Sequence, residues 1–396
     1  MSTEAYISNG LRYIKPYYNT HSNYVKGRWI GKPLVDVLTT EFRSFSRDHY
    51  IEQIAQGNYQ LKRDDVSLDV RSSPLRSGDV VTMRQHKHEP PVKQWCDLEL
   101  ENCDNSSRIA GFEIVQNNDR FLVINKPVGI PVHPTGQFYH NTITEILKDH
   151  GQVVSPCYRL DKVTSGLLIL AKNNMAARDI QMKIGARDMN KIYLARVRGR
   201  FPHTTTGTTF SEDQLDNLFQ HNSITTVANS PIYSIEPKKR FPAGLSDSKE
   251  AKTIFYPIRH LPETNESIVA CKPLTGRTHQ IRIHLARLGF PIVNDSIYNT
   301  ECTMYSNRLQ FMKDYHHWEH SPLTQDQLSL RFQQIINETK AVRYLKLDES
   351  NGTCKECGVS LMADPQMSQL ELYLHAWRYY DNDKTFNFKT ELPKWA

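Results

Sequence analysis

The sequence predicts an α+β protein built around a mainly antiparallel sheet. Short strand-like runs recur along most of the chain, and only a few segments show the apolar spacing of a helix. The regular strand–helix alternation of a doubly wound parallel fold is not visible. We also find no internal repeat and no low-complexity tract, which argues against repeat architectures.

Length and composition indicate a folded chain of two or three domains. The 396 residues are 39% hydrophobic and 23% charged, which is typical of globular proteins. No run approaches the roughly 20 apolar residues of a membrane helix, so we expect no membrane span. The net charge of +6 suits a nucleic-acid partner but equally an ordinary cytosolic enzyme, so charge alone decides nothing.

The start of the chain and its cysteines bear on the compartment. The opening "MSTEAYISNG" has neither the apolar block of a secretory signal nor the Arg-rich character of a mitochondrial presequence. The seven cysteines are mostly scattered, which favours a reducing compartment over a disulfide framework. We expect a cytoplasmic or nuclear protein, and a mitochondrial share stays open.

The first 100 residues are predicted to form a basic, aromatic segment and a small module. Aromatic and cationic residues alternate in "LRYIKPYYNTHSNYVKGRW", which suits RNA contact, although folding back onto the next domain explains it equally well. Two helices are expected between residues 32 and 57, followed by strands in "NYQLKRD" and "LRSGDVVTMRQ". This order resembles the RNA-binding module of the ribosomal-protein-S-four type.

A proline-stiffened connector, "HKHEPPVKQW", separates this module from the larger domain expected over residues 101–396. Its His86, His88 and Glu89 could in principle bind a metal, but no partner spacing supports it. We therefore interpret them as a loop that touches the neighbouring domain. Further along, helices are expected in "NTITEILKDHG", in "NNMAARDIQMKIGARDMN" and after Thr278, and an irregular, charged insertion is expected at about residues 300–352.

Several chemistries find no motif. A phosphate-binding loop and a dinucleotide fingerprint are both missing, so no nucleotide cofactor is indicated. Cys354 and Cys357 form a single Cys-x-x-Cys; His375 or another cysteine could complete a zinc site across the fold, but no second pair stands at finger spacing. We expect no metal. Cys157 could imitate a cysteine hydrolase, but its apolar surroundings favour a place in the core.

One carboxylate remains, Asp161 in "CYRLDKVTSGLLILAK". An arginine facing it would keep it ionised, and it could then attack an anomeric carbon or an electrophilic ring carbon. A glycosidase would need a second carboxylate, and none stands in a comparable context. Taken alone, a structural ion pair explains an Arg-x-Asp equally well.

Four ordered motifs decide between these interpretations. They are Lys126-Pro127-x-Gly129, the stretch from Tyr158-Arg159-Leu160-Asp161 through Thr164-Ser165-Gly166-Leu167-Leu168, Lys191-x-Tyr193-x-Ala195, and Thr275-Gly276-Arg277-Thr278-His279-Gln280-Ile281-Arg282. Together they resemble the RluA-type pseudouridine synthases, and Leu374-His375-Ala376 resembles the strand that closes that family's domain. Segments such as "GLRYIKPYY" and "PVHPTG" are similar to eukaryotic, fungal-type members. Two positions depart from the pattern: Tyr158 replaces a common histidine, and Asn294 a common glycine.

The resemblance implies roles for particular residues. Asp161 would be the nucleophile, Arg282 its ion-pair partner, and Tyr193 a platform for the uracil that could also take a proton from carbon 5. RNA contacts are expected from the following cations and histidine: Arg159, Lys126, Arg277, His279 and Arg196.

The resemblance also implies a substrate. Fungal-type members act on tRNA in the anticodon stem-loop, and the compact length favours position 31 over position 32. An rRNA- or mRNA-directed synthase, or a non-catalytic RNA-binding protein on the same scaffold, are the alternatives. We expect a monomer that binds tRNA, without a membrane partner and without any cofactor, since the reaction is an isomerisation.

Overall fold

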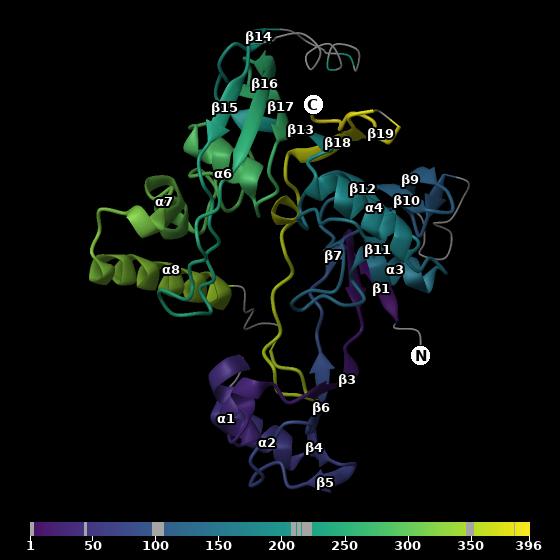
Figure 1. Cartoon of the computed structure of the whole chain (residues 1–396), viewed down its shortest axis with the longest axis vertical. Coiled ribbons are helices and arrows are strands. Elements are labelled where there is room, and N and C mark those ends of the chain that lie inside the picture. Colours follow the sequence, from purple (N-terminus) through teal and green to yellow (C-terminus); the bar gives the residue numbers. More distant parts are fainter. Residues whose placement is uncertain are drawn as a thin grey trace.

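The structure is a computed structural model that describes residues 4–42, 46–96, 107–206, 211, 215, 224–345, 352–383 and 385–396. A 12-stranded sheet forms the centre of this described part (Figure 1). Its main path runs through β14 (Thr205–Thr206), β16 (Lys252–Leu261), β17 (Glu266–Pro273), β13 (Met189–Arg198), β18 (Leu374–Asp381), β12 (Ser165–Ala171), β10 (Phe121–Lys126), β9 (Phe112–Asn117) and β8 (Arg108–Ile109).

Three short strands pair at the side of this path: β11 (Ser155–Pro156) with β12, β15 (Thr226–Asn229) with β16, and β19 (Asn387–Lys389) with β18. Two of the described strand pairs, β12 with β18 and β14 with β16, are parallel, and the others are antiparallel. The predicted α+β fold with a mainly antiparallel sheet is therefore confirmed.

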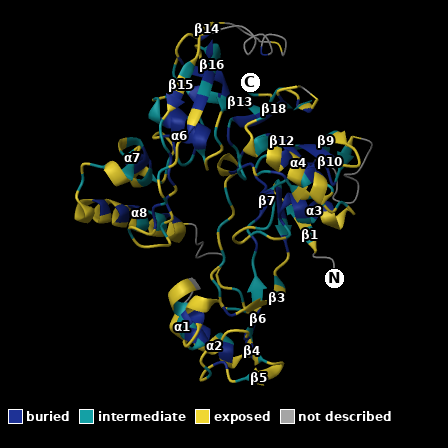
Figure 2. Cartoon of the chain, in the orientation of Figure 1, coloured by how far each residue is buried: buried dark blue, intermediate teal, exposed yellow. Residues whose placement is uncertain are grey.

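Helices cover the two halves of the sheet. Helices α3 (Ile143–Asp149) and α4 (Asn174–Gly185) share a core with β10 and β12, whereas α6 (Gln280–Arg287) packs on β13 and β17. Figure 2 shows buried residues concentrated in the strands and exposed ones along the outer face of α4. The apolar run from Leu167 to Leu170 is fully buried, because β12 is covered on both faces.

A smaller unit with its own core lies at the opposite end of the molecule (Figure 1). It contains a four-stranded sheet in the order β3 (Tyr17–Tyr24), β6 (Val80–Lys87), β4 (Tyr59–Arg63) and β5 (Val66–Leu68). Beside this sheet lie α1 (Leu34–Val37), a short π-helix over Leu38–Phe42, and α2 (Arg47–Ala55). The Ser46 side chain caps α2 by accepting the His49 N–H. The two helices and the strands match the expected order, while the ribosomal-protein-S-four resemblance and RNA binding stay predictions.

The first residues of the chain leave this unit and pack near the large sheet. Strands β1 (Ala5–Ser8) and β2 (Leu11–Ile14) form a three-stranded sheet with β7 (Val92–Lys93). The Arg12 guanidinium donates to Asn141, and the Tyr17 hydroxyl donates to Glu89 at 2.8 Å. These aromatic and basic residues therefore fold back onto neighbouring parts of the protein, as one of the two interpretations of the segment expected.

The insertion near residues 300–352 differs from the prediction. It contains α7 (Ser306–Asp314) and α8 (Gln325–Leu345) rather than irregular structure. Leu328, Phe332 and Ile335 are buried on one face of α8, in a third core that includes residues of α6 and α7. The charged residues of α8 lie on its exposed face. Because they are so many, the apolar spacing of the buried face was not recognised in the sequence. No helix in the described ranges is long and apolar enough to cross a membrane.

Candidate active site

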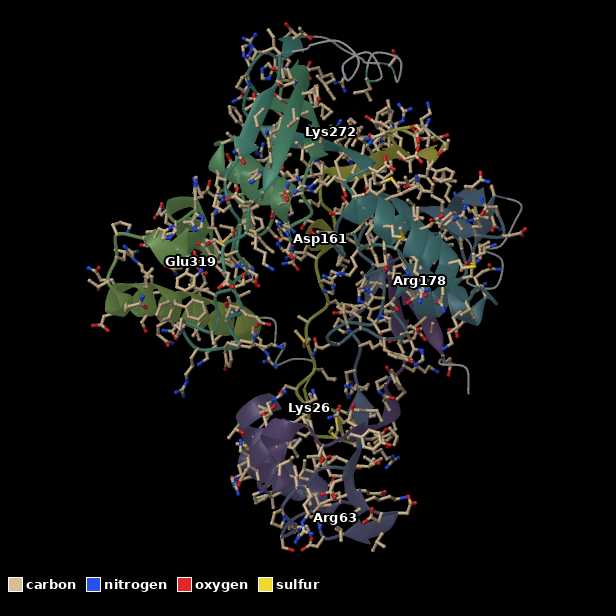
Figure 3. All side chains as sticks on the ribbon, viewed as in Figure 1. Lys26, Arg63, Asp161, Arg178, Lys272 and Glu319 are labelled. Atoms are coloured by element: carbon tan, nitrogen blue, oxygen red, sulfur yellow. The ribbon has the colours of Figure 1, made fainter. Side chains whose placement is uncertain are left out.

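Asp161 lies in the loop between β11 and β12, where the two halves of the sheet meet (Figure 3). The loop begins at buried Cys157, which sits in the core as expected, and Leu160 is also buried. The Thr164 N–H donates to the Asp161 carbonyl at 3.1 Å, which closes a turn. The Asp161 side chain is 33% exposed, so the carboxylate is open to a substrate while its backbone is anchored.

Gly166 allows β18 to approach the strand that follows this loop. Its φ of +106° is a conformation that suits glycine, and a Cβ there would lie 2.2 Å from the Ala376 carbonyl oxygen. The parallel pair of β12 and β18 forms at this point, with Gly166 opposite Ala376. A glycine is therefore needed at position 166 so that β12 and β18 can pair beside the site.

The Lys-Pro-x-Gly motif, at the end of β10, is hydrogen-bonded to the backbone of the Asp161 loop. The Lys126 ammonium is fully buried and donates to the carbonyls of Pro127, Lys162 and Thr164 at 2.8, 3.0 and 2.9 Å. The Gly129 N–H donates to the same Lys162 carbonyl at 2.9 Å. The prediction that Lys126 contacts RNA is therefore wrong, because all three donors of this buried group point into the protein.

Arg282 bridges two carboxylates. Its Nε and Nη2 atoms donate to the two oxygens of Asp295 at 2.8 Å each, and its Nη1 atom donates to Asp161 Oδ2 at 3.3 Å. Burial lowers the pKa of Arg282, but the two carboxylates more than compensate and hold it above its ordinary value. The cation therefore stays charged beside Asp161, and its orientation is fixed by the bidentate pair.

Asp295 is a site residue that the sequence analysis did not single out. It is fully buried, and besides Arg282 it accepts the backbone N–H groups of Ile297 and Tyr298 at 2.9 and 3.0 Å. Its pKa is raised by burial, but the Arg282 charge and these hydrogen bonds lower it below the ordinary value. The segment "PIVND" was noted only for Asn294, although an acid directly after a buried run was a usable signal.

His279 is a second residue that approaches Asp161 Oδ2. Its Nε2 atom is 3.6 Å from Asp161 Oδ2, and its Nδ1 atom bonds the Tyr298 hydroxyl at 3.0 Å. Burial and the Arg282 charge lower its pKa to about 4, against the opposing effect of Asp161, so the ring is neutral at physiological pH. His279 also has a left-handed backbone and is the N-cap of α6, so the helix expected after Thr278 begins at Gln280.

Tyr193 lies on β13, half-buried in a group of tyrosines of which Tyr379 is fully buried. Its hydroxyl bonds the Tyr379 hydroxyl at 2.5 Å, and the Tyr379 ring contacts that of Tyr158 with centroids 4.9 Å apart. Burial raises the pKa of Tyr193 to about 12, and the nearby Asp161 charge adds to that shift. Tyr379 was not predicted, because nothing in "HAWRYY" distinguishes it from a core tyrosine.

The remaining predicted RNA contacts differ in their surroundings. Arg159 is exposed and makes no ion pair with any residue that the structure describes. Arg277 is exposed too, and only its Nε atom is used, on the Glu250 carbonyl at 3.0 Å. Arg196 pairs with buried Glu266 at 2.5 Å, so its charge is already matched within the protein, and its RNA contact stays a prediction.

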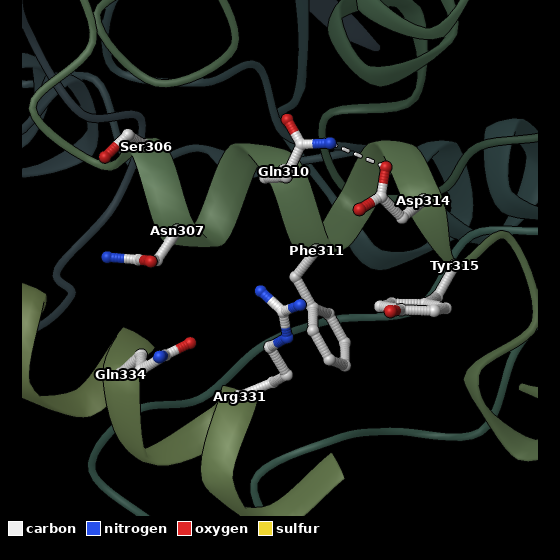
Figure 4. A pocket seen from close by; sticks show the side chains of 8 residues that line it. All are labelled: Ser306, Asn307, Gln310, Phe311, Asp314, Tyr315, Arg331 and Gln334. Carbon is white, nitrogen blue, oxygen red and sulfur yellow. Dashed lines mark hydrogen bonds between the residues drawn. The ribbon is translucent and has the colours of Figure 1, made fainter. Parts of the chain in front are cut away.

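Two further places could hold a ligand. A hollow between α7 and α8 is lined by Ser306, Asn307, Gln310, Phe311, Asp314, Tyr315, Arg331 and Gln334 (Figure 4), and none of these residues belongs to the Asp161 site.

The second place corrects the expectation that His86 and His88 lack metal-binding partners. The structure brings both histidines together with Cys354 and Cys357.

Comparison with known proteins shows which family this chain resembles. The family model described as RNA pseudouridylate synthase matches residues 120–287, which include Lys126, Asp161, Tyr193 and Arg282. The tRNA pseudouridine(31) synthase of Saccharomyces cerevisiae is 53% identical over 99% of this chain and 97% of its own length. The mitochondrial tRNA pseudouridine(32) synthase of the same yeast is 34% identical, over 99% of this chain and 78% of its own.

Among solved structures, human RNA pseudouridylate synthase domain containing 1 matches 75% of this chain and 86% of its own, with 20% identity and a TM-score of 0.43. The extent and identity of the two yeast matches are more than a shared domain would produce. The chain therefore belongs to the RluA-type family of RNA pseudouridine synthases, isomerases that convert uridine in RNA to pseudouridine.

Proposed function

We propose that this enzyme modifies tRNA, at the uridine in position 31 of the anticodon stem-loop. The relative named for position 31 shares 53% of its residues with this chain over nearly its whole length. The relative named for position 32 shares 34%. A difference of this size supports position 31 as the target. We propose that the enzyme is cytoplasmic, and the mitochondrial name of the second relative makes mitochondrial tRNA worth testing.

The observation that carries the proposed chemistry is the Asp161–Arg282 pair. Asp161 is one-third exposed and bonded at 3.3 Å to a cation that Asp295 holds in place. Asp295 itself is fully buried and cannot reach a substrate. One accessible carboxylate suits a nucleophile whose reaction ends in recombination of sugar and base, whereas hydrolysis of a glycosidic bond uses two.

The reaction then follows from this geometry. Asp161 attacks the target nucleotide, either at C1′ of the sugar or at the uracil ring, and the bond between N1 and C1′ breaks. The base rotates, C5 bonds to C1′, and the bond to Asp161 breaks, which frees the carboxylate. The proton on C5 leaves, and N1 gains one. Atoms and electrons balance without an external reagent. Arg282 donates to the Asp161 carboxylate at 3.3 Å and holds it in place for attack.

Tyr193 suits stacking on the uracil better than proton transfer. With a pKa of about 12, its phenolate form is populated on the order of one part in 10⁵ at pH 7. The neutral hydroxyl is bonded to Tyr379, which fixes the plane of the ring. A fixed aromatic face beside a carboxylate suits a flipped base, whose extrusion costs a few kcal/mol and needs a stacking partner.

Substitution of Asp161 tests the chemistry. We expect Asp161→Ala and the closer analogue Asp161→Asn to reduce pseudouridine formation on a tRNA transcript by at least about 10³-fold, with RNA binding retained. Asp326→Asn, an exposed acid on α8, is the matched control and should keep full activity. Activity of Asp161→Ala near that of the unsubstituted enzyme would end the proposal that Asp161 is the nucleophile.

Site-by-site mapping of pseudouridine tests the target. In a strain that lacks the gene, we expect position 31 of tRNA to lose its pseudouridine and the Asp161→Ala gene not to restore it. Loss at position 32 instead would overturn the positional assignment. Loss confined to rRNA or mRNA would overturn tRNA as the substrate. Separate mapping of cytoplasmic and mitochondrial tRNA shows which compartment the enzyme serves.

A further inference from the structure

Four side chains from two distant segments meet beside the small N-terminal unit. His86 and His88 come from β6 and its end, while Cys354 and Cys357 lie in the segment between α8 and β18. Their ligand atoms, one from each residue, all lie within 4.8 Å of one another. Figure 1 shows this segment descending from the large sheet to β6.

The distances between nitrogen and sulfur suit a tetrahedral metal. His86 Nδ1 is 3.5 Å from Cys354 Sγ, and His88 Nε2 is 3.4 Å from Cys357 Sγ. Zinc bonds of about 2.3 Å to sulfur and 2.0–2.1 Å to nitrogen, at tetrahedral angles, place the two ligand atoms about 3.5–3.6 Å apart. The observed distances agree with that spacing within about 0.2 Å.

The backbone of each segment presents its pair of ligands together. Residues two apart on a strand point to the same side, which places both histidines toward the cysteines. The cysteines lie in a tight turn, closed by the Gly358 N–H on the Cys354 carbonyl at 2.8 Å, with Gly358 at a φ of +66°. The Glu356 N–H points at Cys354 Sγ from 3.4 Å and would stabilise a thiolate there.

A second layer of contacts orients His86. Its Nε2 atom, on the side of the ring away from Cys354, faces Glu356 at 3.8 Å. The Tyr18 ring stacks on the imidazole with centroids 4.7 Å apart, and only 5% of the His86 side chain is exposed. A carboxylate behind a histidine is the usual arrangement at metal ligands, since it fixes the ring and its tautomer.

We propose that these four residues bind one structural zinc ion. Two thiolates and two imidazoles form a set that selects zinc over calcium or magnesium, which prefer oxygen. Four protein ligands complete a tetrahedron and leave no position for a substrate, so the ion is structural rather than catalytic. This site is separate from Asp161 and does not depend on the proposed function.

The ion would fasten the small unit to the catalytic part. The segment that carries the cysteines continues past Asp364, which accepts from the Tyr13 hydroxyl at 2.5 Å, and past Glu371, which pairs with Lys93. It then enters β18, the strand parallel to β12. Zinc would therefore close a link from β6 to the strand beside the Asp161 loop.

Metal analysis of the purified full-length chain tests the site. We expect about one zinc per chain in the unsubstituted protein, and close to none in His86→Ala and in Cys354→Ser. Cys302→Ser is the matched control, because it removes an exposed thiol outside the cluster and should keep the zinc. Zinc retained in His86→Ala would overturn the histidine ligands, and an unsubstituted chain that takes up no zinc after reduction would overturn the site.

Cobalt replacement gives a second readout that needs no variant to fold. We expect the unsubstituted chain loaded with Co²⁺ to show the intense visible bands of tetrahedral coordination and the sulfur charge-transfer band of two thiolates. A weak octahedral spectrum, or a Cys354–Cys357 disulfide that re-forms in the presence of excess zinc, would contradict the proposal. Both readouts are independent of pseudouridine formation, so failure of one proposal leaves the other intact.

Discussion

The Asp161 loop and the His86–Cys354 region are both assembled from segments far apart in the chain, but they are held differently. Around Asp161 the partners are buried polar groups of the protein: Lys126, which holds the loop backbone, and Arg282 with Asp295, which hold the carboxylate. Around His86 the partners are soft side chains that suit an added ion. The Asp161 loop joins two strands of one continuous sheet, whereas the small unit has its own sheet and its own core.

We expect the largest effect when the charge of Arg282 is removed. Arg282→Met leaves Asp295 buried without a cation, and we expect a loss of about 3–5 kcal/mol in the free energy of unfolding, measured with denaturant. Activity should also disappear. The double variant Arg282→Met with Asp295→Leu should recover stability but not activity. Recovery of both would show that Arg282 has no role beyond balancing Asp295.

A smaller effect is expected from Lys126→Met. The substitution removes the donor to two carbonyls of the Asp161 loop, Lys162 and Thr164, and to the Pro127 carbonyl. Buried acceptors without partners cost about 1–3 kcal/mol. We expect kcat to fall more than KM rises. The loop carries the nucleophile Asp161, which acts in the chemical step, whereas the proposed RNA contacts Arg159 and Arg277 are unchanged. Lys148→Met, on the exposed side of α3, is the control. Unchanged stability of Lys126→Met would contradict the supporting role of this lysine.

Low pH should weaken the catalytic part through buried neutral histidines. Burial lowers the pKa of His284 and of His375 from 6.5 to about 4. Because these folded pKa values lie below the unfolded ones, the unfolded chain binds more protons as pH falls. Stability is therefore fully present above pH 6.5 and declines between pH 6.5 and 4, by at most about 1.4 kcal/mol per pH unit for each histidine.

Replacement of one of these histidines checks the assignment. His284 bonds Thr253 and the Ser230 carbonyl, and His284→Gln keeps hydrogen-bonding capacity without a titratable ring. We expect the slope of unfolding free energy against pH, measured between pH 6.5 and 4, to become shallower in this variant. An identical slope would mean that His284 takes up no extra proton on unfolding.

The sequence allowed some of these features to be predicted and hid others for physical reasons. The apolar run after Asp161 predicted a buried strand, because four consecutive apolar residues need cover on both faces. Lys126 was misassigned, since a lysine before proline resembles an exposed cation until the sheet closes over it. The cluster of His86 with Cys354 joins positions 268 residues apart, and no local spacing encodes that contact.

We expect the smallest effects from two arginine substitutions, one of an exposed arginine and one of an arginine in an ion pair. Arg159 is exposed beside Asp161, so Arg159→Gln should leave unfolding unchanged and weaken tRNA binding a few-fold, with the slope of log affinity against log salt smaller by about 1. Arg196→Gln should do the reverse, because it removes one cation from buried Glu266 and leaves RNA contacts in place. Titrations of both variants at several salt concentrations, with denaturant curves beside them, check the pair. If Arg196→Gln changed the salt slope as much as Arg159→Gln, the ion pair with Glu266 would have to open when RNA binds, and the division between supporting and RNA-facing arginines would fail.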